Sequence, residues 1–422
     1  LNPHAYEIQY WHQNVWIKQF DETTGALAIY NENFFKTLDN LSLTATIFAN
    51  GVEQIKVAID DTKGIAPQTT KQIACEALKN AIAKTKSKNG DKEITVNFAF
   101  ASDGSEPLVD KGQVLARQQF VVSAYCFDKV SKAQEIASQA ASAKHESSNE
   151  AKKKASAKTA KQLASNLEVE ETNSYVKVSA DRLTVTVGEQ TGLIDYLDVG
   201  GEPVLKFSES IRPEFWRAPT DNDYGASMPL QMNVWRNPVM KLKAFEKKDS
   251  VVLTATFVME KVKAELQLRY CINGSGQLTL TEKMTTDKAA KVPELFRYGM
   301  VIDLPASFSK IEYYGRGPEE CYVDRHSSAF IGKYEANVKD EYYPYVRPQE
   351  SGNHFDIRFF SVFNPSTGKG LTFEGFAPIE CSAVPYSVAD LDSGDVKEHA
   401  WGQHSGDLVE KDLTQVHIQQ RQ

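Results

Sequence analysis

Three pairs of polar residues have types and spacing that could do acid–base chemistry. Glu32 follows Asn31 in the segment YNENFF, Glu319 and Glu320 are adjacent, and Glu350 precedes His354 in RPQESGNH. An Asn-Glu pair ends a strand in many barrel enzymes, where the Glu serves as the general acid/base. Cleavage of a glycosidic bond with retention takes two carboxyl groups about 5–5.5 Å apart.

None of these pairs predicts a self-contained catalytic centre. A barrel strand requires alternating strands and helices, whereas the residues around Glu32 are patterned as strand, turn, strand. Neighbouring residues of an extended chain point to opposite sides, so Glu319 and Glu320 cannot flank one bond. Glu350 and His354 could act as a base and an acid on a sugar hydroxyl, although the pattern favours a role in fixing their loop. We predict no catalytic residue in this chain.

The composition excludes several classes of protein. The 422 residues are 41% apolar and 25% charged, with a net charge of −8. A nucleic-acid partner requires a basic face, and a membrane span requires about 20 consecutive apolar residues. Neither pattern is present, so we predict no nucleic-acid or membrane partner. The eight histidines lack the spacing of a metal site, and the five scattered cysteines are expected to be free thiols.

Short alternating segments predict a β-sandwich over residues 1–127. Residues 5–20 alternate apolar and polar side chains and are expected to form a strand. Further strands are predicted at 41–51, 93–100 and 116–125, with a short helix within the Ala- and Lys-rich stretch 69–90.

Residues 128–171 differ in composition from both of their neighbours. The stretch 129–165 is dominated by Ala, Ser, Lys and Glu, and it has no sustained apolar stripe. Such a segment has little surface to bury, so we predict a linker that is helical or disordered. The domain boundary is placed there.

Residues 172–422 predict one large all-β domain of two stacked sheets. The clearest hairpin runs over 264–284, where alternating apolar residues flank an Asn-Gly turn at 273–274. Two more strands are expected around a turn within 175–187.

Long motifs in this domain resemble the C-terminal domain of bacterial β-galactosidases of glycoside hydrolase family 2. They are RPEFWRAPTDNDYG, YYGRGPEECYVDRHSSAFIGKY, PYVRPQESGNHFDIRFF and SAVPYSVADLD. Residues 3–40, which include YNENFF, likewise resemble the immunoglobulin-like domain that follows the catalytic barrel in that family. Glu32 therefore belongs to the pattern of that domain and not to the barrel.

The resemblance implies an all-β chain in two parts. An N-terminal immunoglobulin-like β-sandwich would be followed by a large antiparallel supersandwich of the galactose-mutarotase-like type. The sequence stops before the Gly-rich strand of the family, so the last strand or strands are expected to be missing. The run LTQVHIQQ, residues 413–420, is then expected at an exposed sheet edge. The missing starting Met favours a cut or incomplete product over a natural small subunit.

The implied function is that of a non-catalytic C-terminal part of a β-galactosidase. Such an enzyme hydrolyses terminal β-D-galactose from β-galactosides such as lactose, and this part would complete the active-site wall and the oligomer. The expected partners are the catalytic barrel, the substrate and further copies in a homo-oligomer. The Mg²⁺ and Na⁺ of the parent enzyme would be held outside this chain, and its compartment would be the bacterial cytoplasm or periplasm. The alternatives are a free-standing carbohydrate-binding module and an aldose-epimerase-like enzyme that uses Glu350 and His354.

The resemblance also selects candidate site residues. Some family members place a Trp in the galactose pocket, and Gln415 stands near that position, which makes Trp401 a possible substitute. The full set of candidate substrate contacts is Trp401, His399, His404, Gln415, Glu350, Asn353 and His354. A structural role is expected for Arg217, Asp221, Asn222, Asp223 and Arg347.

Overall fold

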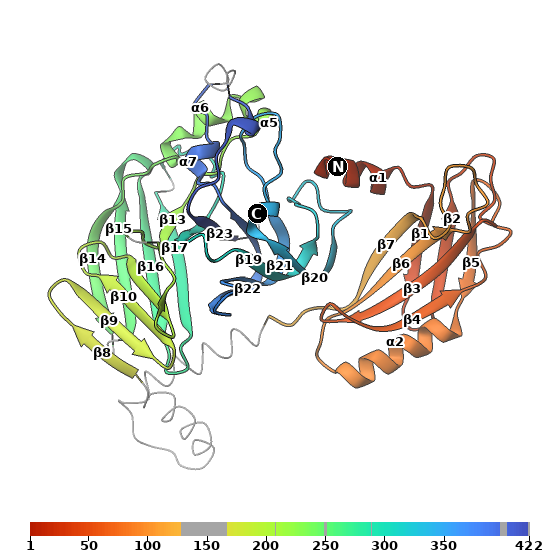
Figure 1. Ribbon diagram of the computed structural model, residues 1–422, viewed down its shortest axis with the longest axis horizontal. Helices are drawn as coiled ribbons and strands as arrows, with labels where there is room; N and C mark the ends of the chain where they lie inside the picture. The colour runs from red at the N-terminus through yellow and green to blue at the C-terminus, as the bar shows by residue number, and fades with distance from the viewer. Residues whose placement is uncertain (128–166, 207, 249–250, 288, 397–402, 421–422) are drawn as a thin grey trace, which may run out of the picture. The chain divides into compact units, whose positions relative to one another are not determined.

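A computed structural model describes residues 1–127, 167–206, 208–248, 251–287, 289–396 and 403–420 (Figure 1). Strands account for 47% of the structure and helices for 13%, which confirms the all-β class. The predicted linker, 128–171, lies outside the described residues except for Leu167–Glu171, which form a strand. The chain divides into two compact units, the first made of Leu1–Phe127, Tyr313–Tyr334 and His354–Arg358, and the second of the remaining chain.

The N-terminal part of the first unit is a β-sandwich with two helices. Its strands are β1 (Val15–Asp21), β2 (Ala26–Asn31), β3 (Leu41–Ala49), β4 (Val52–Ile59), β5 (Thr69–Ala74), β6 (Ile94–Ser102) and β7 (Val114–Ser123). They form a sheet in the order β1-β2-β5 and another in the order β4-β3-β6-β7. Ile17 and Ile29 of one sheet share a core with Ile47 and Phe98 of the other. The predicted short helix is α2 (Glu76–Asn89), whose Leu78 packs into the same core.

The prediction of a strand over residues 5–20 is wrong in its first half. Residues Pro3–Trp11 form helix α1, and β1 begins only at Val15. The Asn2 side chain accepts a hydrogen bond from the His4 backbone N–H at 2.9 Å, and proline occupies the first helical turn. An Asn cap followed by Pro is a strong helix-start signal, and it outweighs the alternating pattern that follows it.

The second unit contains most of the remaining strands. A five-stranded sheet has the order β12-β11-β10-β9-β8, and a four-stranded sheet has the order β14-β15-β16-β17. These strands are β8 (Leu167–Glu171), β9 (Tyr175–Ala180), β10 (Leu183–Gly188), β11 (Ile194–Val199), β12 (Glu202–Pro203), β14 (Lys241–Lys248), β15 (Val252–Met259), β16 (Ala264–Ile272) and β17 (Leu278–Thr286). The predicted hairpin is confirmed as β16 and β17, which pair in register from Ala264–Thr286 to Ile272–Leu278.

A seven-stranded sheet has the order β13-β18-β23-β22-β21-β19-β20. Its strands are β13 (Arg212–Glu214), β18 (Gly299–Leu304), β19 (Lys310–Gly317), β20 (Phe330–Asn337), β21 (His354–Phe363), β22 (Gly370–Val384) and β23 (Thr414–Gln420). Short helices lie between strands of this part of the chain. They are α5 (Asp221–Gly225), α6 (Met228–Met232), η1 (Asn233–Trp235), η2 (Glu260–Val262), η3 (Val338–Asp340), α7 (Val388–Leu391) and η5 (Ser405–Asp407).

The C-terminal run LTQVHIQQ does not lie at a sheet edge, which corrects the sequence prediction. Strand β23 pairs with β18 on one side, where His417 faces Val301, and with β22 on the other, where His417 faces Ser382. Its backbone groups therefore have partners on both sides. Strand order in an antiparallel sheet is set by contacts between distant segments, so the position of a strand in the sequence does not fix its position in the sheet.

Candidate functional site

A buried cluster of charged side chains lies in the second unit. Arg297, which precedes β18, is only 1% exposed. Its guanidinium donates to Glu214 Oε2 at 3.0 Å and to Glu350 Oε1 at 2.6 Å. His417 of β23 contacts the same Glu214 oxygen through Nδ1 at 2.6 Å. Four segments far apart in the sequence therefore bring two carboxylates, one guanidinium and one imidazole together.

The buried negative charge of Glu214 is compensated by the neighbouring groups of this cluster. Burial alone would raise the pKa of Glu214, but the charges and hydrogen bonds of His417 and Arg297 outweigh it and hold that pKa below its ordinary value. A buried carboxylate stays ionised only when it has such partners. The two Glu side chains are 8% and 6% exposed, so the arrangement holds protein segments together and gives a ligand little access.

Two of the candidate substrate contacts, Asn353 and Gln415, are also engaged inside the protein. Asn353 is 1% exposed and donates to Glu380 Oε2 at 3.2 Å. Gln415 is 4% exposed, donates to Asp303 Oδ1 at 2.7 Å and accepts from the Val388 backbone N–H at 2.8 Å. These contacts give both side chains structural partners, and a role in substrate binding stays a prediction.

The remaining candidates include one fully buried histidine and one exposed histidine. His354 is fully buried in the first unit, where its ring stacks on Tyr313 with the centroids 4.2 Å apart. Glu350 forms an ion pair with Arg297 at 2.6 Å. His404 is exposed. Trp401 and His399 lie outside the described residues.

In the segment RPEFWRAPTDNDYG, charge-assisted hydrogen bonds hold the stretch that connects β13 to α5. Arg217 donates to both carboxylate oxygens of Asp223, at 2.5 and 3.1 Å. Asp223 also accepts from the Thr220 backbone N–H at 2.7 Å and completes a capping box at the start of α5. Burial would raise the pKa of Asp223, but the Arg217 contacts lower it below its ordinary value. Asp221 pairs with Arg347 at 3.5 Å.

The other members of this segment divide between core and surface. Phe215 and Trp216 are 2% and 3% exposed, as expected for core residues. Asn222 is exposed on α5. The segment therefore has the contacts of a structural turn.

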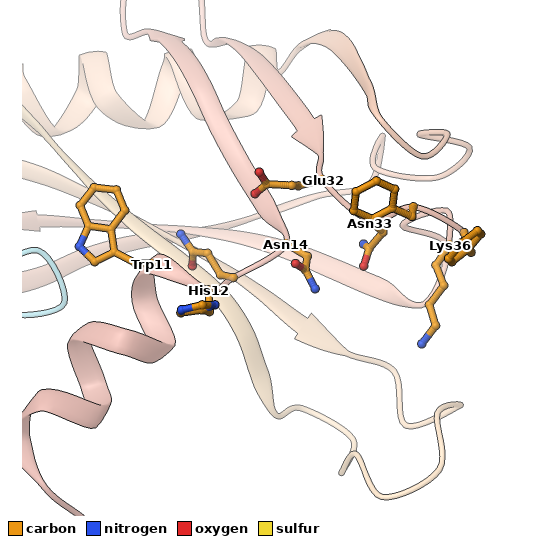
Figure 2. Close-up of a pocket in the computed structure, with 9 residues that line it drawn as sticks. Trp11, His12, Asn14, Glu32, Asn33 and Lys36 are labelled. Carbon is orange, nitrogen blue, oxygen red and sulfur yellow. The ribbon is translucent and has the colours of Figure 1, made fainter.

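Glu32 borders a hollow on the surface of the first unit (Figure 2). The hollow has a volume of about 440 Å³ and is lined by residues 11–14 and 32–36. Glu32 follows β2 and accepts a hydrogen bond from the Trp16 indole N–H at 2.7 Å. Figure 2 shows its carboxylate between Trp11 and Asn33. Glu32 is the one carboxyl group among these lining residues, whereas a retaining glycosidase uses two.

Neither a cluster of metal-binding side chains nor a membrane-spanning helix is found in the described part of the chain. No group of three or more His, Cys, Asp or Glu side chains there is arranged to hold a metal ion. No described helix is both long and apolar enough to cross a bilayer. All five cysteines are free thiols, and Cys271, Cys321 and Cys381 are buried.

Sequence reasoning missed two features. Arg297 stands in VPELFRYGM without a recognisable motif, and its partners come from residues 83, 53 and 120 positions away. Helix α1 was taken for a strand, so the hollow beside its last residue, Trp11, was not expected. The Asn2-Pro3 helix start is the sequence signal that indicates helix α1.

Comparison with known proteins connects both units to one family. The family described as β-galactosidase small chain matches residues 179–422, and the family described as β-galactosidase domain 4 matches residues 27–123. A β-galactosidase from Priestia megaterium is 24% identical over 93% of this chain and 35% of its own length. One from Lactobacillus delbrueckii subsp. bulgaricus is 34% identical over 43% of this chain and 18% of its own length.

A third relative, from Streptococcus thermophilus, is a β-galactosidase 27% identical over 60% of this chain and 23% of its own length. The chain thus spans about a third, or less, of the length of these relatives. The resemblance inferred from the four motifs is confirmed. The chain belongs to the β-galactosidase small-chain family and corresponds to the C-terminal region of a β-galactosidase.

Proposed function

We propose that this chain is a non-catalytic part of a β-galactosidase that completes the wall of the active site and the oligomer. The parent enzyme would remove terminal β-D-galactose from β-galactosides such as lactose by the retaining mechanism. Its catalytic carboxylates and its Mg²⁺ and Na⁺ ligands would lie in a barrel portion outside this chain. The compartment would be the bacterial cytoplasm or periplasm.

The observation that supports this proposal most strongly is the way the candidate carboxylates are engaged. Glu214 and Glu350 are tied to Arg297, and Glu320 is paired with Arg325 at 2.6 Å. A carboxylate whose oxygens are engaged in an ion pair with a guanidinium would have to leave that pair before it could act on a substrate. Glu32 is exposed and has no second carboxylate beside it in the lining of its hollow.

The epimerase alternative has less support. It required a glutamate and a histidine converging on one pocket, with Glu350 and His354 as the pair. Glu350 is held in an ion pair by Arg297, and His354 is fully buried with its ring stacked on Tyr313. A sugar hydroxyl would have to displace these contacts before it could reach either side chain.

Hydrolysis of a chromogenic β-galactoside tests the proposal. The chain alone is expected to give no turnover, because a retaining mechanism needs two positioned carboxylates. The remaining part of its own coding region, expressed separately, is expected to become active when this chain is added. Turnover by the purified chain alone that is lost in Glu32→Gln would overturn the proposal. Turnover by the remaining part at the same rate with and without this chain would overturn it as well.

A further inference from the structure

The hollow beside Glu32 is surrounded by aromatic side chains that face solvent. Phe34 is 73% exposed, Phe35 is 96% exposed, and Trp11 is 60% exposed. All three line the hollow, together with the Glu32 carboxylate. We call Trp11, Glu32, Phe34 and Phe35 the aromatic face. Two adjacent phenylalanines with this much exposure are unusual on a soluble protein, and clustered exposed aromatics mark interaction sites.

The loop that carries these rings is held in place by hydrogen bonds. The Asn31 side chain, which is fully buried, donates to the Lys36 carbonyl at 2.8 Å and to the Ile65 carbonyl at 2.9 Å. Gln68 donates to the Glu32 carbonyl at 2.7 Å. The two phenylalanines are therefore displayed by a loop that is anchored on both sides. A preorganised loop loses little conformational freedom when a partner binds.

Two candidate occupants fit the aromatic face poorly. Its geometry disfavours a sugar ring, and its charge disfavours a second copy of the chain. The Phe34 and Phe35 rings are tilted by 44°, with centroids 6.3 Å apart, so they form a wedge and not the flat platform on which a sugar ring stacks. A second copy of the chain, related by a twofold axis through this face, would bring one Glu32 carboxylate near the other. Like charges placed together in that way oppose association.

The partner that fits is a protein segment with an apolar side chain and a hydrogen-bond donor. The apolar side chain would fill the hollow between the rings. The Glu32 carboxylate accepts one described hydrogen bond, from Trp16, and an ionised carboxylate can accept several. An arginine, a lysine or an amide of the partner could use that capacity.

We propose that the aromatic face docks the part of a β-galactosidase that lies outside this chain. The inference rests on the proposed function and specifies the surface through which that function would be assembled. The relatives of this chain have about two thirds or more of their length outside the region that this chain spans. A face that is costly to leave in water and already rigid suits a permanent contact with that portion.

Affinity between the two parts tests this proposal without relying on activity. The remaining part of the coding region is expressed as a separate polypeptide, and its binding to the chain is measured by titration calorimetry. The double variant Phe34→Ser/Phe35→Ser is expected to bind at least about 30-fold more weakly, the effect of losing an aromatic hot spot. Glu32→Gln is expected to bind about tenfold more weakly. The matched control is Leu108→Ser, which changes an equally exposed apolar residue outside the hollow and should leave affinity unchanged.

The outcomes separate this proposal from the proposed function. Unchanged affinity in the double variant, or no binding at all, overturns the docking surface. If the wild-type chain restores activity and the double variant binds with unchanged affinity, the docking surface is wrong and the proposed function is retained. Phe-dependent binding without activity keeps the surface and removes the function. Self-association of the chain that the double variant abolishes would identify a second copy as the occupant, and a lactose-induced change in Trp fluorescence that it abolishes would identify a sugar. Either result would overturn the proposal.

Discussion

The Arg297 cluster and the aromatic face are opposite in composition and in exposure. The cluster contains four ionisable side chains, and each of them is at most 8% exposed. The aromatic face contains three large rings, and each of them is at least 60% exposed. Polar residues are thus buried where the sequence predicted sugar contacts, and apolar residues are exposed where it predicted an ordinary strand and turn. The comparison indicates that the cluster maintains the fold, whereas the aromatic face is available to a partner.

The largest loss of folding stability is expected from Arg297→Met. Removing the guanidinium leaves Glu214 and Glu350 buried without their shared cation, which should lower the free energy of unfolding by about 3–5 kcal/mol. Urea unfolding measures the change. Lys243→Met, in an exposed ion pair with Glu265, is the matched control and should cost less than about 1 kcal/mol.

A second variant keeps that test decisive if Arg297→Met does not fold. Replacing both carboxylates as well, by Glu214→Gln and Glu350→Gln, should recover part of the lost stability because no unpaired charge remains. Equal destabilisation in the single and triple variants would contradict the account of the cluster.

Glu282 on β17 should behave in the opposite way to Glu214. Its Oε1 atom is buried without a hydrogen-bond partner among the described residues, and burial raises its pKa to about 8. The folded protein keeps a proton that the unfolded chain loses near pH 4.5, so stability falls as pH rises from about 4.5 to about 8. The slope is about 1.4 kcal/mol per pH unit, and Glu282→Gln should remove it. An identical slope in the variant would show that Glu282 ionises freely.

Glu214 has the other sign, because its folded pKa is lowered. The stability that it contributes is present above its ordinary pKa of 4.5 and is lost as pH falls below that value. Urea midpoints between pH 5 and pH 3 should therefore fall more steeply in the wild type than in Glu214→Gln.

A smaller effect is expected from Asp223→Asn. The change weakens the bidentate contact with Arg217 and the cap of α5, which should lower the free energy of unfolding by about 1–2 kcal/mol. Asn222→Ala changes the neighbouring exposed residue and should shift the urea midpoint little. Comparable losses in both variants would show that the cap is not the source of the stability.

The smallest effect on stability is expected at the aromatic face. Phe34→Ser/Phe35→Ser removes side chains that contribute little buried area to this chain, so the free energy of unfolding should change by less than about 0.5 kcal/mol. A loss of more than about 2 kcal/mol would place both rings in the core and remove the reason for proposing a docking surface.

Local patterns allowed much of the fold to be predicted. The hairpin of β16 and β17 follows from alternation around Asn273-Gly274, and the family follows from four long motifs. The α1 error came from giving alternation more weight than the Asn2-Pro3 helix start. The position of β23 between β18 and β22 could not be predicted, because no local sequence pattern specifies which distant strands pair with each other.

The site was harder to predict than the fold. Polar residues in a motif, such as Glu350 and Asn353, serve equally well as ligand contacts or as buried partners, and only their neighbours in space decide between the two. Arg297, which is central to the cluster, is not marked by any local pattern. The exposure of Phe34 and Phe35 depends on packing that the segment YNENFF does not encode by itself.

Hydroxyl-radical footprinting of the chain, alone and mixed with the remaining part of its coding region, compares the aromatic face and the cluster in one measurement. We expect Phe34, Phe35 and Trp11 to be oxidised rapidly in the chain alone and to be protected at least about fivefold in the mixture, because a docked partner excludes solvent. His417, buried in the cluster, should be oxidised slowly in both samples. Equal oxidation of the three aromatic residues in both samples, while the mixture hydrolyses a β-galactoside, would contradict the account.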